Sequence, residues 1–298
     1  MIRLAVRVRR ERAELVLAEL LELSPGGVEE VQVGEEAVEY AVYGAPGELP
    51  GLPALDAAVG DALVEISTSE LPDDWHERWR HFHRPVLIEP PRRAPAGRHR
   101  VPAIRVRPPW ETAGAGRAGG EIEEIVIDPG QAFGTGGHAS TRLCLESLQE
   151  LAGREGPGGP LLDVGTGSGV LAIAAARLGF SPVLALDNER ESVAAARSNA
   201  TLNGADIEVR RFDVSRETLP WMNAGGSPAG SLVVMANLLR PLLLELAQLM
   251  PRAPAHLVAG GLLREEAAEV ASAFGERLGL RVRAQIERGE WAAVWLAS

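Results

Sequence analysis

The sequence predicts an α/β protein in which a mostly parallel, seven-stranded sheet follows a small N-terminal α+β domain. Three observations lead to this prediction. From about residue 121 onward, short apolar runs typical of buried strands alternate with longer helical stretches, which favours a layered α/β fold. A glycine-rich turn joins the first of these strands to a helix. The first part of the chain instead carries period-two runs, which are typical of half-buried antiparallel strands.

Residues 1–67 are predicted to form a ferredoxin-like domain. Strands are expected where apolar and polar residues alternate, and helices where Leu, Ala and Glu recur at helical spacing. The expected elements are a strand at 2–8, a helix at 12–23, strands at 28–33 and 37–43, a short helix at 54–59 and a strand at 62–67. This order is that of the split βαβ sandwich. Because the segment carries no obvious catalytic chemistry, we expect it to recognise a substrate or to serve a structural role.

Residues 68–120 are predicted to connect the two domains. The stretch 73–82 begins with two aspartates and spaces its aromatic residues along one helix face, so a helix is expected there. Around it, the Pro/Arg run at 90–93 and the Gly/Ala run at 114–120 are low-complexity loops that cannot build a core. The aromatic residues of the helix are interpreted as packing residues in preference to a ligand cage.

Residues 121–298 are predicted to form the seven-stranded sheet. Its expected strands are 160–164, 183–186, 207–212, 231–236, 256–259, 281–286 and 291–296. Helices are expected at 170–178, 189–202, 242–249 and 265–278. The last two strands follow each other without a helix between them, so they should form an antiparallel hairpin at the end of an otherwise parallel sheet.

Composition and charge disfavour several classes of function. The net charge of −11 is unfavourable for general nucleic-acid binding, because phosphates attract basic surfaces. No apolar run approaches the ~20 residues of a membrane span, and the first residues lack the apolar core of a signal peptide. The single cysteine, Cys144, permits no internal disulfide, and the histidines lack partners at metal-ligand spacing. We therefore expect a cytoplasmic protein without a membrane anchor or a bound metal.

The glycine-rich turn indicates a nucleoside-containing ligand. It reads Asp163-Val164-Gly165-Thr166-Gly167-Ser168-Gly169. Glycine lets backbone approach a ligand without a Cβ in the way, and the turn aims the N-terminus of the next helix at that ligand. The spacing is G-x-G-x-G, and Val170 stands where a dinucleotide-binding motif has its third glycine.

Two carboxylates refine the identity of this ligand. Asp187 ends the next strand, 22 residues after Gly165, where it could accept hydrogen bonds from both ribose hydroxyls. The alternative is that Asp187 caps the helix that begins near Glu189. Asp163 would lie near the cationic amino-acid part of S-adenosylmethionine and would repel a pyrophosphate. These residues favour S-adenosylmethionine over a nicotinamide dinucleotide, and they predict a class I (Rossmann-like) methyltransferase domain.

A second motif lies upstream of the glycine-rich turn. It reads Ile127-Asp128-Pro129-Gly130-Gln131-Ala132-Phe133-Gly134-Thr135-Gly136-Gly137-His138. In this motif and in the glycine-rich turn the chain resembles the ribosomal protein L11 methyltransferase (PrmA) family. The resemblance extends to Ala236-Asn237-Leu238-Leu239, Gly260-Gly261-Leu262-Leu263 and Glu290-Trp291. It covers most of the chain, and the F-G-T-G-x-H block is its specific part.

The resemblance implies a donor, an acceptor and a set of site residues. Methyl groups would pass from S-adenosylmethionine to lysine side chains, and to the N-terminal α-amine, of the large-subunit ribosomal protein L11. The implied donor contacts are Thr141, Gly165, Asp187 and Asn237, with Phe133 and Gly134 in a loop over the donor. Asp163 and Gly167 of the glycine-rich turn complete the expected donor site. Asn237 is the expected catalytic residue, because its amide could accept a hydrogen bond from the amine; a strand-end turn residue is the alternative.

Other interpretations stay open at this point. The connector insertions depart from the family, and they leave room for another protein or a small amine as the acceptor. A non-catalytic module that holds the donor as a structural ligand is a further alternative, which the intact Phe133–Gly136 block disfavours. His138 could act as a base, but a histidine that holds its loop by hydrogen bonds is favoured. Asp213, after the third strand, could reach the adenine amine.

Overall fold

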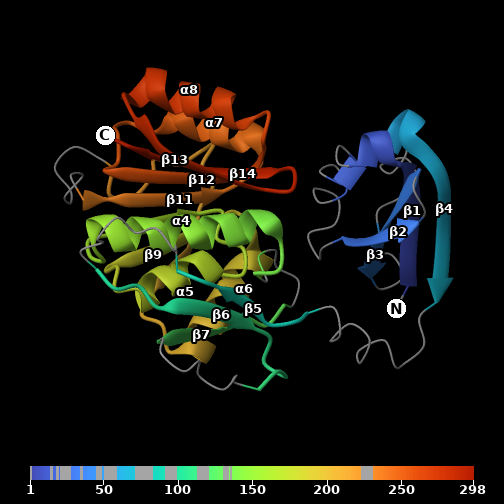
Figure 1. The fold of residues 1–298 in the computed structure, drawn as a ribbon, viewed down its shortest axis with the longest axis horizontal. Coiled ribbons are helices and arrows are strands. Elements are labelled where there is room, and N and C mark those ends of the chain that lie inside the picture. Colours follow the sequence, from blue (N-terminus) through green and yellow to red (C-terminus); the bar gives the residue numbers. More distant parts are fainter. Residues whose placement is uncertain are drawn as a thin grey trace. The chain divides into compact units, whose positions relative to one another are not determined.

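The computed structural model divides the chain into two compact units (Figure 1). One unit comprises residues 1–82 and 130–133, and the other comprises 83–129 and 134–298. The structure describes residues 2–13, 16–17, 20, 28–33, 36–44, 49, 59–70, 83–90, 99–112, 121–129, 134, 136–222 and 231–298. No helix within these ranges is long and apolar enough to cross a membrane.

The first unit contains a four-stranded antiparallel sheet. Its strands are β1 (Ile2–Arg9), β2 (Glu29–Val33), β3 (Ala37–Gly44) and β4 (Leu63–Glu70), in the order β2-β3-β1-β4. Single 3₁₀ turns occur at η1 (Arg10–Arg12) and η2 (Gly60–Ala62). Leu4 and Val6 of β1 share a buried core with Leu20. The helices predicted at 12–23 and 54–59 lie largely outside the described residues, so the ferredoxin-like assignment stays a prediction.

The second unit begins with a small sheet that the sequence analysis did not anticipate. Its strands are β5 (Val86–Ile88), β6 (Ala103–Arg107) and β7 (Ile122–Val126), with β5 antiparallel and β7 parallel to β6. β5 has only three residues and gives a weak signal, whereas β6 and β7 are of ordinary length but are set between low-complexity loops. In β6, Ile104 and Val106 are buried, whereas the arginines that alternate with them pair with Glu124 of β7. The helix predicted at 73–82 lies outside the described residues, and the domain boundaries stay predictions.

The main sheet of the second unit has seven strands. In chain order the elements are α4 (Ala139–Glu155), β8 (Leu161–Val164), α5 (Val170–Arg177), β9 (Val183–Asp187), α6 (Arg190–Asn203), β10 (Glu208–Arg211), β11 (Val233–Asn237), α7 (Arg240–Leu249), β12 (His256–Leu263), α8 (Ala267–Leu278), β13 (Arg281–Arg288) and β14 (Trp291–Ala297). The strand order is β10-β9-β8-β11-β12-β14-β13. The strands from β10 to β12 are parallel, and β14 is antiparallel to both of its neighbours. The predicted seven-stranded, mostly parallel sheet is therefore confirmed.

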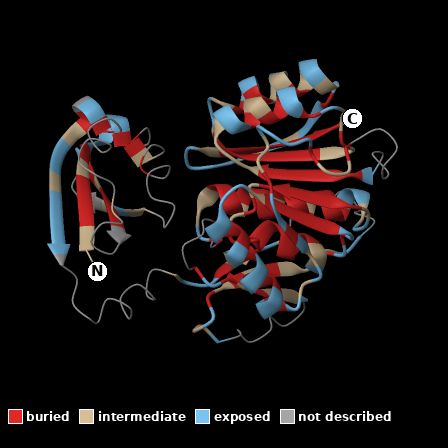
Figure 2. Cartoon of the chain, turned by 180° about the vertical axis from the view of Figure 1, so that it is seen from behind, coloured by how far each residue is buried: buried red, intermediate tan, exposed pale blue. Residues whose placement is uncertain are grey.

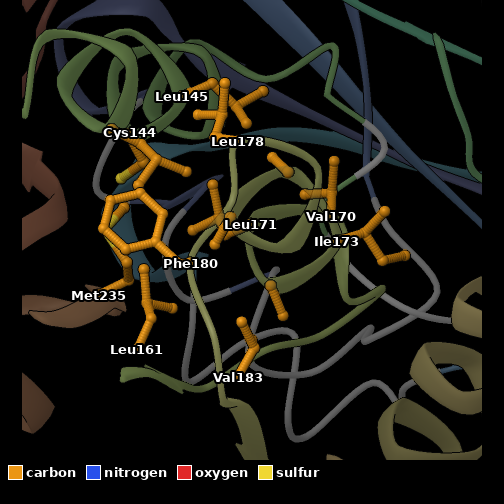
Figure 3. Packing of buried hydrophobic residues seen from close by; sticks show 14 of the residues in the cluster. Cys144, Leu145, Leu161, Val170, Leu171, Ile173, Leu178, Phe180, Val183 and Met235 are labelled. Carbon is orange, nitrogen blue, oxygen red and sulfur yellow. The ribbon is translucent and has the colours of Figure 1, made fainter. Parts of the chain in front are cut away.

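Helices cover both faces of this sheet, and its central strands are buried, whereas the edge strands β10 and β13 are largely exposed (Figures 1 and 2). Successive residues of a strand point to opposite faces. Leu161 therefore joins the core formed with α4 and α5, whereas Leu162 joins the core formed with α7 and α8. Figure 3 shows the first of these cores, with Leu161, Val183, Leu171 and Cys144 among its members. Cys144 is fully buried, in agreement with its interpretation as a small hydrophobic residue.

The strand order reverses between β8 and β11. From β8 the chain passes through α5 to β9 on one side, and it returns to the other side of β8 as β11. In open parallel sheets, ligands bind outside the carboxyl ends of the strands at such a point. The strands that end there are β8, followed by Gly165, β9, which ends at Asp187, and β11, which ends at Asn237. The fold thus brings three predicted site residues to one edge of the sheet.

Candidate active site

The glycine-rich turn leaves β8 along a path that requires glycine. Gly165 and Gly169 have φ angles of +74° and +84°, in the left-handed region that residues with a Cβ rarely adopt. The N–H groups of Gly165 and Thr166 both donate to the carbonyl of Leu186 at 2.9 Å, which ties the turn to β9. A Cβ on Gly165 would lie only 2.2 Å from Cδ2 of Leu238. The path of the turn is therefore fixed from two sides.

Asp187 holds the same turn from the end of β9. Its Oδ2 accepts a hydrogen bond from the N–H of Gly167 at 2.9 Å, and its Oδ1 accepts one from the N–H of Glu189 at 3.0 Å. Burial raises the pKa of Asp187, and its backbone hydrogen bonds oppose that increase. The N-cap of α6 is Glu189, so Asp187 lies two residues before the cap and is not itself the helix cap. A carboxylate has about four acceptor positions and the backbone of Gly167, Asn188 and Glu189 takes up to three of them, so one can still accept from a ribose hydroxyl. The ribose contact stays a prediction.

Asp163 is a fully buried carboxylate on β8. Its Oδ2 accepts a hydrogen bond from the hydroxyl of Thr166 at 2.6 Å, whereas its buried Oδ1 has no hydrogen-bond partner among the described residues. Burial raises the pKa of Asp163 from 3.8 to about 7, and the charge of Asp187 adds to this increase. Hydrogen bonds from the Thr166 hydroxyl and from the backbone of Ala172 oppose it. A cation close to this carboxylate would favour its ionised form and lower its pKa.

Asn237 ends β11 beside a second buried polar residue. Its Nδ2 donates to Oγ1 of Thr141, in the first turn of α4, at 3.5 Å. Its Oδ1 is buried, and no described residue donates a hydrogen bond to it. Gly260 of β12 lies opposite Asn237, and a Cβ there would be 3.2 Å from this oxygen. The structure thus brings Asn237 and Thr141 together and leaves the amide oxygen able to accept a hydrogen bond.

The upstream motif leads from β7 to α4. Phe133 lies outside the described residues. Gly134 has a φ of +100°, and its carbonyl accepts a hydrogen bond from the hydroxyl of Ser168 at 2.6 Å. His138 is the N-cap of α4: its Nδ1 accepts from the N–H of Ser140 at 3.3 Å and lies 2.8 Å from the hydroxyl of the same residue. Burial lowers the pKa of His138 to about 4. These contacts agree with a histidine that organises its loop.

Asp213 is already engaged in local contacts after β10. Its Oδ1 accepts hydrogen bonds from the N–H and the hydroxyl of Ser215, and its Oδ2 pairs with Arg216 at 3.2 Å. It also lines a surface cavity with Asn188, Arg211, Arg216 and Glu217. Adenine contact by Asp213 therefore stays a prediction. The described residues contain no group of three or more His, Cys, Asp or Glu side chains that could hold a metal ion.

Two buried asparagines on α6 were missed by the sequence analysis. Asn203 binds the backbone of Val126, directly before the upstream motif, and Asn199 binds that of Asp128 within it. Asn199 also binds the glycine-rich turn. The available signal was a pair of asparagines at i, i+4 in an Ala-rich helix. Asparagine is unfavourable inside a helix, so such a pair indicates that the side chains have specific partners.

Comparisons with known proteins identify the family of this chain. The family model described as "Ribosomal protein L11 methyltransferase (PrmA)" matches residues 55–298. The chain belongs to this family. It is 38% identical over 243 residues to the ribosomal protein L11 methyltransferase of Geobacter sulfurreducens, covering 80% of this chain and 71% of the relative. With the Myxococcus xanthus protein of the same name it shares 35% identity over 235 residues, covering 78% and 72%.

A solved structure supports the same assignment for this methyltransferase. The crystal structure of the ribosomal protein L11 methylase from Lactobacillus delbrueckii subsp. bulgaricus matches with a TM-score of 0.53 and 27% sequence identity. The match covers 71% of this chain and 96% of the other. The predicted class I methyltransferase fold is therefore confirmed, and the methyl donor is S-adenosylmethionine.

One feature of this methyltransferase's site fits that donor. The buried carboxylate of Asp163 has one oxygen to which no described residue donates, and a cationic ligand suits such an oxygen. A pyrophosphate at the same place would be repelled. The residues present therefore fit a positively charged nucleoside better than a dinucleotide.

Proposed function

We propose that the chain is a protein-lysine N-methyltransferase that acts on ribosomal protein L11. Lysine side chains and the N-terminal α-amine of L11 are the proposed acceptors. The observation that carries the proposal is the buried Oδ1 of Asn237, which lies at the switch point of the sheet and suits a donated N–H from an amine. The names of the relatives, which specify L11, support this choice of acceptor. We further propose that the protein is cytoplasmic and does not bind nucleic acid directly.

The proposed donor site combines the glycine-rich turn with the ends of the neighbouring strands. Its residues are Thr141, Gly165, Asp187 and Asn237, with Phe133, Gly134, Asp163 and Gly167. Asp163 would face the positive charge of the donor, and Asp187 would accept hydrogen bonds from its ribose. The proposed catalytic residue is Asn237.

Methyl transfer requires mainly that the donor and the acceptor amine be correctly positioned. The bound donor supplies a methyl group on a positively charged sulfur, which is a good leaving group. A free lysine amine has a pKa of about 10.4, so the acceptor must lose a proton before it attacks. Removal from water next to a positive charge lowers that pKa. Asn237 would then hold an N–H of the neutral amine and direct its lone pair. His138 is not needed as a base, because it caps α4.

Residues 1–67 are proposed to recognise the protein substrate, with 68–120 as the connector. The described core residues of the second unit all lie between Val86 and Leu296, which supports donor binding without the N-terminal segment. Deletion of residues 1–67 should therefore abolish methylation of L11 while donor binding, measured by calorimetry, survives. Loss of both activities would contradict the two-module arrangement.

A labelling experiment tests the acceptor. The full chain is incubated with methyl-labelled S-adenosylmethionine and with purified L11, either unmodified or with every lysine replaced by arginine. Label should enter the first protein, and in the second only the α-amine should remain labelled. If unmodified L11 and a whole ribosomal-protein extract both stay unlabelled while donor binding is normal, the proposed acceptor is wrong.

A further inference from the structure

Asn199 and Asn203 stand one turn apart on the buried face of α6. Beside them runs the outer edge of β7, whose other edge pairs with β6. Asn203 accepts a hydrogen bond from the N–H of Val126 at 2.8 Å and donates one to its carbonyl at 2.7 Å. Asn199 accepts one from the N–H of Asp128 at 3.0 Å. Alternate residues of an extended chain face the same edge, so the two amides take the place of a neighbouring strand.

Asn199 differs from Asn203 in a second contact. Its Nδ2 donates to the carbonyl of Ser168, in the glycine-rich turn, at 2.9 Å. The hydroxyl of Ser168 in turn donates to the carbonyl of Gly134 at 2.6 Å. Asp128 and Gly134 flank the central part of the upstream motif. Both flanks are therefore connected to Ser168, one through the amide of Asn199 and the other directly.

The packing around this connection is tight. Ser168 and Asn199 are buried. A Cβ on Gly134 would lie 3.1 Å from Oγ of Ser168, and a Cβ on Gly169 would lie 3.2 Å from the Cα of Ala196 on α6. In such surroundings a lost hydrogen bond leaves a buried backbone group unsatisfied. The turn would then have to shift or admit water, and either change alters the site that faces the donor.

We propose that Asn199 is a positioning residue for the methyl donor, acting through Ser168. It fixes the glycine-rich turn relative to the two flanks of the upstream motif, so that the donor site is formed before the donor binds. Without this connection, the turn would have to become ordered when the donor binds. The free-energy cost of that ordering would lower the affinity for the donor. The inference rests on donor binding alone, so it can fail or hold independently of the proposed acceptor.

The matched control is Asn203, which lies on the same helix face. Its side chain makes three hydrogen bonds, to Val126 and to the carbonyl of Asn199. Asn203→Ala should therefore lower the Tm of the unliganded protein at least as much as Asn199→Ala does. In calorimetry with S-adenosylmethionine, Asn199→Ala should raise the Kd by about tenfold, the factor that corresponds to ~1.4 kcal/mol. Asn203→Ala should leave the Kd within about twofold of the unmodified protein.

Two further variants isolate the contact with Ser168. Asn199→Asp keeps an acceptor for the N–H of Asp128 but loses the donor to Ser168, so it should raise the Kd as Asn199→Ala does. Ser168→Ala removes the bond to Gly134, and in that background the effect of Asn199→Ala on the Kd should be smaller, because the two act in one connection.

The outcomes that overturn the proposal are distinct. Asn203→Ala weakening donor binding as much as Asn199→Ala would show that the helix merely stabilises the fold. The same conclusion would follow if, across all variants, the rise in the Kd for the donor were proportional to the loss in Tm. If Asn199→Ala does not fold, Asn199→Asp and Ser168→Ala provide the test, and donor affinity equal to that of the unmodified protein in both would overturn the proposal.

Discussion

Asp163→Asn is the substitution that tests the site most directly. Asparagine keeps the shape of the side chain and an acceptor for the hydroxyl of Thr166. In the folded protein the pKa of Asp163 is about 7, against an ordinary value of 3.8. Between these two pH values, Asp163 is therefore protonated in the folded state and ionised in the unfolded chain. This contribution to stability falls as the pH rises from about 4 to 7, by ~4 kcal/mol in total at about 1.36 kcal/mol per pH unit.

His138 titrates in the opposite sense over nearly the same range. Its pKa in the folded protein is about 4, below the ordinary value of 6.5. The folded state therefore holds fewer protons than the unfolded chain, and stability is lost as the pH falls from 6.5 towards 4. The two contributions partly cancel in the unmodified protein. The contribution of the Asp163 carboxylate is therefore obtained from the difference in unfolding free energy between the unmodified protein and Asp163→Asn.

Urea unfolding of the two unliganded proteins from pH 5 to 8 measures this difference. Asp163→Asn should gain about 3 kcal/mol of unfolding free energy relative to the unmodified protein over this range, which covers the two pH units below 7. Donor affinity of the unmodified protein should rise with pH through 7, because a cation favours the ionised carboxylate. The affinity of Asp163→Asn should be lower and flat. A stability difference that does not change with pH would refute the reasoning.

Three other substitutions test the neighbouring geometry. Gly165→Ala forces a Cβ to 2.2 Å from Leu238 at a φ of +74°, so it should cost at least about 1–2 kcal/mol of stability by urea unfolding and weaken donor binding; an unchanged protein would contradict the packing. His138→Asn keeps a cap acceptor but loses the ring contact with Trp291 at 4.6 Å between centroids. This variant should retain kcat, and its unfolding free energy should no longer fall between pH 6.5 and 4 on account of His138. A well-folded but inactive variant would instead indicate that His138 acts as a general base. Asn237→Ala should lower kcat by about 100-fold by releasing the acceptor amine, and wild-type kcat would remove Asn237 from catalysis.

The main sheet could be predicted because its signals are local. β8 is an apolar run of strand length between helical stretches, and the closing strands follow each other without a helix. The insertion of β14 between β12 and β13 has no local signal, because it depends on which strand edge is free after the parallel part has formed. β5 was missed for another reason. Three residues are too few for the alternation of buried and exposed positions to be distinguished from a loop.

Part of the site followed from the sequence by the same logic. Gly165, Asp163 and Asp187 lie at strand ends, so their placement could be derived from the strands alone. Thr141 and Asn237 are 96 residues apart in the sequence. Before the structure, only the family resemblance indicated that they belong to one site. The bond from Asn199 to Ser168 spans 31 residues and depends on how α6 packs against the turn. Packing of this kind has no period that a sequence pattern could reveal.

The burial that makes β8 predictable as a strand also lets Asp163 discriminate between cationic and anionic ligands. All four residues of β8 are buried, so a carboxylate within it has little access to water. Near neutral pH the unliganded protein therefore holds Asp163 in a mixture of protonated and ionised forms. A cationic donor lowers the pKa of Asp163 and expels that proton, whereas a pyrophosphate would strengthen the proton's hold and bind poorly. Calorimetry at pH 7 in buffers of different ionisation enthalpy should therefore detect proton release when S-adenosylmethionine binds, and Asp163→Asn should abolish it.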